Sequence, residues 1–298
     1  MQRNSAWDSE KAHEAAAVCL RRICPGRLIA CWQPVNNGLS SQRIWHVVTT
    51  QGEWFVKAES GNQVKRYTML SELIPDRRFQ VPLGAEYLPG MDVTLSCAPW
   101  IHGIPLGEYL EHGLALHPER LFGMLGEQIA DMHRIACIDQ RLAWDHNAAW
   151  SSRPDWLSRL AEQSDDAARV LAFVSGHREL MRAVIPCLTH QDLRAGNVLI
   201  LEDGQPCIID FSSVAFSSPY SDLCKITLLA PPFVQRYESD FLQGIFGHAP
   251  EQEELLRIGL FGCVTLACFP AMLWPNMPAH PALLHRACEW LSRHRVLP

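Results

Sequence analysis

The sequence predicts an α+β protein of two lobes, a small β-rich lobe followed by a larger and mainly helical one. The first observation is a series of short β-rich segments, separated by turn residues, across most of the first hundred residues. The second is a change of pattern after Pro99, beyond which apolar residues recur at helical spacing. The length of 298 residues suits two lobes that share a cleft. We therefore predict a first lobe at 1–98, a hinge at 99–103 and a second lobe at 104–298.

The predicted first lobe is built around antiparallel strands. Turn signals at Asn36-Asn37-Gly38 and Gln51-Gly52 separate three stretches of β-forming residues. These stretches are Leu28–Val35, Arg43–Thr50 and Glu53–Ala58. A helix is expected over Asn62–Ile74, because apolar residues recur there every three or four positions before Pro75. A further hairpin is expected from Ala85–Leu88 and Asp92–Cys97.

The predicted second lobe is mainly helical. Pro118 opens a helix with an apolar face, and Ala167–Ile185 is a second strongly helical stretch. Two short strands near Val198–Leu201 and Cys207–Ile209 are joined by a turn, and most of the chain beyond them is expected to be helical.

Composition excludes several classes of protein. The net charge of −6 argues against a nucleic-acid binder, which would show a basic face. The eleven cysteines contain no Cys-x-x-Cys pair, and those among apolar neighbours read as reduced core residues. These are Cys19, Cys24, Cys97, Cys137, Cys187, Cys207 and Cys224. Together with an N-terminus that lacks the apolar stretch of a secretory signal, this predicts a cytoplasmic protein.

One apolar stretch requires a comparison with membrane spans. Ile258–Trp274 is strongly apolar, but prolines beginning with Pro270 interrupt the run. A spanning helix needs about 20 apolar residues, so we interpret the stretch as a buried helix and expect no membrane partner.

The strongest chemical signal is the segment from His190 to Asn197, followed by an apolar strand, a turn and Ile-Asp-Phe ending at Phe211. Asp192 and Asn197 are five residues apart, and Asp210 ends the second strand. Two carboxylates and a carboxamide near a hairpin suit Mg²⁺, which prefers oxygen ligands and is completed by substrate phosphates. Phosphoryl transfer needs little else from a protein beyond positioning and charge neutralisation.

This arrangement, His-x-Asp-x-x-x-x-Asn with Ile-Asp-Phe, resembles the catalytic segments of aminoglycoside phosphotransferases, choline and ethanolamine kinases, and bacterial thiamine kinases. The resemblance implies a protein-kinase-like fold. It also implies that Asp192 is the catalytic base, that Asn197 and Asp210 bind Mg²⁺, and that His190 supports the loop. A later Asp-Leu pair resembles a family segment in which the aspartate, here Asp222, bonds back to the catalytic loop.

The first lobe contains residues that suit a nucleotide. Lys57 ends a β-rich stretch, and a lysine on the buried side needs an anion such as a phosphate. It resembles the strand lysine of kinases. A polar loop with a single glycine would cover the phosphates through Asn37, Gly38, Ser40 and Ser41. The segment Pro99–Leu106 resembles the family's hinge, which implies purine contacts from the backbone near Ala98, Trp100 and Ile101.

The sequence departs from the kinase pattern on the helix after Lys57. Arg66 stands where a glutamate would pair with that lysine, and Glu72 lies two turns later. Glu59 shares a face with Lys57 only if the strand continues beyond Ala58. The partner of Lys57 therefore stays open.

The function predicted is transfer of the ATP γ-phosphate to a hydroxyl of a small molecule, with ATP and Mg²⁺ as cofactors, by a monomer or homodimer. The acceptor is an amino alcohol such as choline or thiamine, or an aminoglycoside. The alternatives are a catalytically silent kinase-like domain that binds nucleotide or a partner, and a nucleotidyltransferase with the same metal centre. Two groups of residues are candidates to meet a cationic acceptor, although core packing and solvation explain them equally well. They are Trp144, Trp150, Trp156, Trp274 and Trp290, and Asp145, Asp155, Asp165 and Asp166.

Overall fold

The computed structural model describes residues 10–23, 29–35, 43–74, 78–114, 117–137, 158, 161–162, 164–273 and 280–296. The chain divides into two compact units. The first unit comprises residues 1–103 together with Cys207–Ile209, and the second comprises 104–206 and 210–298. Each unit is described by itself.

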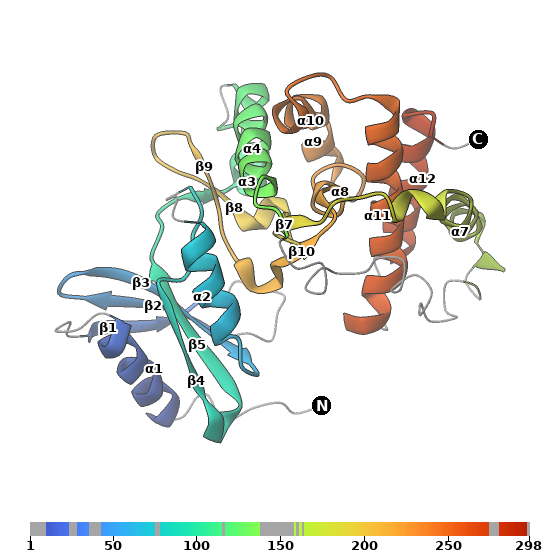
Figure 1. Cartoon of the computed structure of the whole chain (residues 1–298). Helices are drawn as coiled ribbons and strands as arrows, with labels where there is room; N and C mark the ends of the chain where they lie inside the picture. The colour runs from blue at the N-terminus through green and yellow to red at the C-terminus, as the bar shows by residue number, and fades with distance from the viewer. Residues whose placement is uncertain are drawn as a thin grey trace. The chain divides into compact units, whose positions relative to one another are not determined.

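The first unit is built on a five-stranded antiparallel sheet with the strand order β1-β2-β3-β5-β4 (Figure 1). The strands are β1 (Ile29–Pro34), β2 (Arg43–Thr49), β3 (Gly52–Ser60), β4 (Gly84–Leu88) and β5 (Val93–Pro99). The β2–β3 turn is tight, because Gly52 adopts φ +136° and its carbonyl accepts the Thr49 hydroxyl proton at 2.9 Å. The three-strand meander and the hairpin predicted from turn residues are therefore present.

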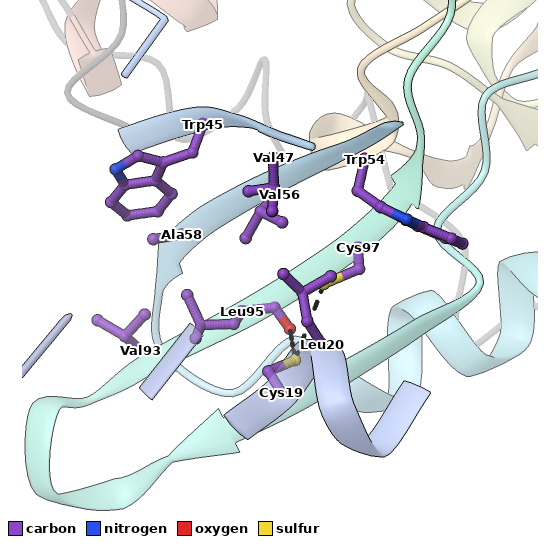
Figure 2. Close-up of a cluster of buried hydrophobic side chains, with 10 residues drawn as sticks. All are labelled: Cys19, Leu20, Trp45, Val47, Trp54, Val56, Ala58, Val93, Leu95 and Cys97. Atoms are coloured by element: carbon purple, nitrogen blue, oxygen red, sulfur yellow. Dashed lines mark hydrogen bonds between the residues drawn. The ribbon is translucent and has the colours of Figure 1, made fainter. Parts of the chain in front are cut away.

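One face of this sheet carries the core of the first unit (Figure 2). Alternation along β3 directs Trp54, Val56 and Ala58 into that core and places Lys57 and Glu59 on the opposite face. The core is covered by α1 (Glu10–Ile23), which contributes Cys19 and Leu20 and contacts β4 and β5. We did not predict α1, and its packing on the sheet explains its buried residues.

Two short elements complete the first unit. The helix α2 (Val64–Leu73) buries Tyr67 and Leu70 and contacts β4. The 3-10 turn η1 (Pro89–Met91) joins β4 to β5. The chain returns to this unit at Ile208, which bridges Phe79 and accepts a hydrogen bond from the Gln80 amide at 2.8 Å.

The second unit is mainly helical (Figure 1). Its helices are α3 (Leu106–Glu111), α4 (Pro118–His133), α7 (Asp165–His177), α8 (Pro219–Leu223), α9 (Pro232–Gln235), α10 (Glu238–Phe246), α11 (Gln252–Leu273) and α12 (His280–Arg293). Glycines allow α4 and α10 to pack closely: a Cβ on Gly126 would overlap the carbonyl oxygen of Phe241, and one on Gly244 that of Gly123. Burial of Leu125, Ile129 and Met132 on α4 agrees with its predicted apolar face.

Short strands and 3-10 turns lie between the helices of the second unit. Antiparallel pairs form between β7 (Cys187–Thr189) and β10 (Ala215–Ser217), and between β6 (Ile104–Pro105) and β8 (Val198–Ile200). The 3-10 turns of this unit include η3 (Arg178–Met181), η4 (Ala195–Asn197) and η5 (Phe211–Ser213). The strand β9 (Pro206–Ile208) lies where the chain passes from the second unit into the first.

Two helices differ in length from their predicted ranges. The helix predicted over Ala167–Ile185 begins at Asp165, where the Ser164 side chain caps it, and tightens into η3 after His177. The helix α11 continues past Pro270 to Leu273. Within the described part of the chain, none of the helices has the length and apolar character needed to cross a bilayer.

The described cysteines are free thiols. Cys19, Cys97, Cys187, Cys207 and Cys224 are buried, as expected for core residues, whereas Cys137 is half-buried. The sulfur atoms of Cys19 and Cys97 lie 4.0 Å apart, which is the separation of neighbouring thiols rather than of a disulfide. Cys24 lies outside the described residues.

Candidate active site

The segment His190–Asn197, called here the 190–197 loop, runs from the end of β7 through η4. His190 is fully buried, its ring meets the Phe211 ring edge-on at 4.7 Å, and its Nδ1 accepts the Asp192 amide proton at 3.2 Å. His190 is thus packed inside the loop, between the Phe211 ring and the Asp192 amide.

Asp222 on α8 anchors the beginning of this loop. Its Oδ2 accepts the His190 amide proton at 2.7 Å, and its Oδ1 accepts that of Gln191 at 2.6 Å. His133, at the end of α4, places Nε2 3.1 Å from Oδ2. Burial by itself would raise the pKa of Asp222, but the His133 contact, the positive field of His133 and His190, and the backbone amide hold that pKa below its ordinary value.

The Asp192 carboxylate is surrounded by hydrogen-bond donors. Its Oδ1 accepts a hydrogen bond from Lys225 Nζ at 2.5 Å. Its Oδ2 accepts hydrogen bonds from Asn197 Nδ2 at 2.9 Å and from Arg194 Nε at 3.2 Å. The Asp192 side chain is one-quarter exposed, so it is held firmly and still reaches solvent. A carboxylate held in this way is suited to orient a hydroxyl group and to accept its proton.

Gln191 holds a backbone conformation that residues with side chains rarely adopt. Its φ is +63°, which costs a non-glycine residue on the order of 1 kcal/mol or more. The side-chain amide donates to the Thr189 hydroxyl at 2.7 Å and to the Ser221 hydroxyl at 2.8 Å. The carbonyl accepts a hydrogen bond from Lys225 at 2.8 Å. Together these contacts hold Gln191 in the conformation that directs the chain to Asp192.

Asn197 and Asp210 supply oxygen atoms of the kind that Mg²⁺ prefers. Both contacts of Asn197 Nδ2 are to oxygens of Asp192, so the amide nitrogen faces that residue and Oδ1 faces the other way. Asp210 adopts φ +65°, and its Oδ1 accepts hydrogen bonds from the Ser212 hydroxyl at 2.7 Å and amide at 3.4 Å. This donor set fits a hard cation.

Only a cation whose coordination is completed by other oxygens would suit this pair. Among the described residues, no group of three His, Cys, Asp or Glu side chains is arranged to hold a metal ion. A carboxylate and a carboxamide, with phosphate oxygens as further ligands, match the usual coordination of Mg²⁺ with a nucleotide.

In the first unit, Lys57 lies buried on β3. Its Nζ is 4.0 Å from Oε1 of Glu59, and both side chains are buried. β3 continues to Ser60, so the condition under which Glu59 shares a face with Lys57 is met. Arg66 lies half-buried in the first turn of α2, and Glu72 is exposed at the other end of the helix. The structure therefore brings the Glu59 carboxylate close to Lys57.

The residues predicted to contact the purine lie at the end of β5 and just beyond it, and Ala98 and Trp100 already have partners in the first unit. Ala98 is buried and pairs with Phe55 of β3. The Trp100 amide donates to the Glu53 carbonyl at 2.9 Å, and the Trp100 ring stacks on His46 at 4.1 Å. The Trp100 amide is therefore already occupied within the first unit.

Several predicted site residues lie outside the described residues. They are Asn37, Gly38, Ser40, Ser41, Trp144, Trp150, Trp156, Trp274, Asp145 and Asp155. Trp290 is fully buried, and its indole donates to Glu238 at 2.5 Å, so core packing accounts for it. Asp165 and Asp166 lie in the first turn of α7, where negative side chains interact favourably with the helix dipole. Oδ2 of Asp166 lies 3.0 Å from Nδ1 of His285.

Sequence reasoning missed Lys225 and His133. Lys225 stands between Cys224 and Ile226 in an otherwise apolar segment, one turn after Asp222, and that isolated charge was the available signal. His133 ends α4, 89 residues before Asp222, and no local pattern indicates the contact.

Residues 32–256, which make up most of the chain, match the model of the phosphotransferase enzyme family. The chain belongs to that family. No curated protein matches the sequence.

The fold agrees with those of solved kinases of low sequence identity. A choline kinase from Streptococcus pneumoniae aligns with a TM-score of 0.63 and 14% identity, covering 95% of this chain and 100% of that one. A spectinomycin phosphotransferase, solved with ADP and spectinomycin, aligns with a TM-score of 0.61 and 14% identity over 94% and 93%. A putative fructosamine-3-kinase from Haemophilus somnus 129PT aligns with a TM-score of 0.61 and 13% identity, covering 93% of this chain and 96% of that one. The predicted α+β, protein-kinase-like two-lobe fold is confirmed.

Proposed function

We propose that this protein is an ATP-dependent kinase that moves the γ-phosphate to a hydroxyl of a small molecule. Asp192 is the base, and Asn197 and Asp210 hold Mg²⁺. The observation that carries the proposal is the Asp192 carboxylate itself, partly exposed and fixed beside Asn197 on a loop anchored by buried Asp222. Such fixed positioning is what phosphoryl transfer requires of a protein.

The proposed reaction is a single displacement. The Asp192 carboxylate orients the acceptor hydroxyl and accepts its proton as the acceptor oxygen forms a bond to the γ-phosphorus. The bond between the γ-phosphorus and the β–γ bridging oxygen breaks, and ADP leaves. Bound Mg²⁺ would supply neutralisation of the phosphate charge. Lys57, steadied by Glu59, would bind the nucleotide phosphates as a buried cation.

The nucleotide assignment is supported by the ligands of similar proteins. The spectinomycin phosphotransferase holds ADP, and an aminoglycoside phosphotransferase similar in fold holds AMP-PNP with hygromycin B. Family membership agrees with the same chemistry. The acceptor class proposed is a small hydroxyl compound, either an amino alcohol such as choline or thiamine or an aminoglycoside.

The test is incubation of the protein with Mg-ATP and a panel of acceptors, with ADP and AMP resolved among the products. The panel contains choline, ethanolamine, thiamine, spectinomycin, hygromycin B and simple sugars. Acceptor-dependent ADP is the expected result. AMP would instead identify a nucleotidyltransferase, and nucleotide binding without turnover for any acceptor would identify a silent kinase-like domain.

A further inference from the structure

The segment that begins with Asp222 holds the 190–197 loop at four points. Asp222 accepts the backbone amide protons of His190 and Gln191. Lys225, three residues later, donates to the Gln191 carbonyl at 2.8 Å and to Asp192 Oδ1 at 2.5 Å. A single short stretch of chain therefore binds both the backbone amide and the carbonyl of Gln191, and it also binds the side chain of the next residue, Asp192.

Lys225 is the better shielded of the two cations on Asp192. Its side chain is 14% exposed, whereas that of Arg194 is 46% exposed. The two cations bond different oxygens, with Lys225 on Oδ1 and Arg194 on Oδ2. An exposed guanidinium is free to exchange its partner for solvent or ligand, whereas a half-buried, two-point ammonium contact is not. Lys225 thus fixes Oδ1 of the Asp192 carboxylate, while Asn197 donates to Oδ2.

We propose that Lys225 is a positioning residue for Asp192, which holds the carboxylate in the orientation that receives the acceptor hydroxyl. The inference rests on the proposed function of Asp192 as the base. The charge-assisted bond fixes Oδ1, so Oδ2 is the oxygen directed to the acceptor; it keeps its bond to Asn197 while the exposed Arg194 is displaced. The bond to the Gln191 carbonyl stabilises the positive-φ turn that carries Asp192.

The expected consequence of losing this contact is a loss of turnover. A displacement of about 1 Å at a reacting group lowers rates by on the order of a hundredfold. We expect Lys225→Met, which keeps the length of the stem without its charge, to lower kcat by about thirtyfold to a hundredfold. Lys225→Arg, which keeps a cation, should recover part of this loss. Affinity for Mg-ADP should stay within about twofold, because Asn197 and Asp210 are unchanged.

The decisive experiment is a double-mutant cycle of Lys225→Met and Asp192→Asn, followed by kcat for ADP formation from Mg-ATP with the best acceptor of the panel. If Lys225 acts through Asp192, Lys225→Met has little further effect in the Asp192→Asn background. Arg286→Met is the matched control, since Arg286 also donates to a backbone carbonyl, that of Leu229 at 3.2 Å, away from the loop. It should turn over at the parent rate.

Three results would overturn the inference. Lys225→Met at the parent rate would remove the role altogether. Equal fold-losses in the two backgrounds would show that Lys225 acts independently of Asp192. A lowered melting temperature with loss of Mg-ADP binding in both Lys225 variants would assign only a structural role. If instead the parent and Asp192→Asn form ADP at the same rate, the proposed function itself fails, and this inference fails with it.

Discussion

The two candidate regions of this protein are held in place by different kinds of contact. In the first unit, Lys57 and Glu59 are positioned by strand register, two residues apart on one face of β3. In the second unit, Asp192 is positioned by side chains that follow it by about thirty residues, Asp222 and Lys225. One arrangement depends on a sheet ladder and the other on buried polar contacts over a long sequence separation.

This difference indicates where each region is sensitive to substitution. A sheet of five strands tolerates loss of one side-chain contact, because the backbone ladder remains. A loop with a positive-φ residue and a buried carboxylate anchor does not, because each lost contact leaves buried polar groups unpaired. Substitutions should therefore have larger effects in the 190–197 loop and its supports than around Lys57.

The largest effect is expected at Asp222. Asp222→Asn replaces one carboxylate oxygen by an NH₂ group that faces a donor, so the unfolding free energy should fall by about 3–5 kcal/mol. Turnover should fall at least a hundredfold as the loop loosens. Asp131→Asn is the matched control, because Asp131 pairs at the surface of α4 with exposed Arg134. Urea unfolding of both variants checks the claim, and equal stabilities would contradict it.

The parent and Asp222→Asn should also differ in acid. The pKa of Asp222 is lowered in the folded state, so its stabilising contribution is present above its ordinary pKa of 3.8 and is lost as the pH falls below that value. The parent should therefore lose stability more steeply than Asp222→Asn as the pH falls below about 4. Parallel stability curves over this window would exclude the lowered pKa.

A smaller effect is expected for Asp210, on nucleotide binding. If Asp210 holds Mg²⁺, the parent should bind ADP at least about tenfold more tightly with Mg²⁺ than without it, since a charge-assisted contact of this kind is worth about 1.4 kcal/mol or more. Asp210→Ala should lose that dependence while keeping its metal-free affinity. Calorimetric titration with and without Mg²⁺ measures both. Equal affinity of the two proteins in Mg²⁺ would remove Asp210 from the metal site.

The effect at Glu59 should be smaller again. Glu59→Gln removes the carboxylate 4.0 Å from Lys57 but leaves the β3 ladder, so we expect about fivefold weaker binding of Mg-ATP with kcat little changed. Glu86→Gln is the control and should bind as the parent does, because the Glu86 carboxylate lies on β4 and pairs with exposed Arg22 of α1. A loss as large as that of Lys57→Met would mean that register alone does not position the lysine.

The smallest effect concerns the reactivity of the thiols, which reports how far each cysteine is buried from solvent. Burial raises the pKa of Cys224, between Asp222 and Lys225, to about 12, and it likewise raises the pKa of Cys187 on β7 to about 12. At pH 8 their thiolate fraction is on the order of a thousandfold below that of a free thiol. Cys31 on β1 and Cys137, which are both half-buried, should react with a disulfide reagent before Cys187 and Cys224. Mass mapping of early labels tests this, and early modification of Cys224 would contradict it.

Local pattern predicted the elements and the motif, because both depend on neighbouring residues. The β2–β3 hairpin, the β4–β5 hairpin and α4 follow from turn residues and apolar spacing. The helix α1 was missed, because its role depends on contact of Cys19 and Leu20 with a sheet formed much later in the chain. Propensity alone does not specify such tertiary packing.

A similar distinction applies to the candidate site. Asp192, Asn197 and Asp210 could be chosen as candidates from the sequence, because their spacing is local and their chemistry is distinctive. Lys225 could not be chosen in this way, because its contact with Asp192, 33 residues earlier, depends on the fold. Glu59 was left undecided, because the sequence does not show that β3 extends to Ser60.

The most direct test of the account is the turnover number of Asp192→Asn. This change keeps the size and hydrogen-bonding shape of the side chain and removes the charge that accepts the proton. With Mg-ATP and acceptor saturating, we predict that kcat falls by on the order of a hundredfold or more, while the affinity for Mg-ADP barely changes. Turnover of Asp192→Asn at the parent rate would contradict the central claim, and the base would then have to be another group.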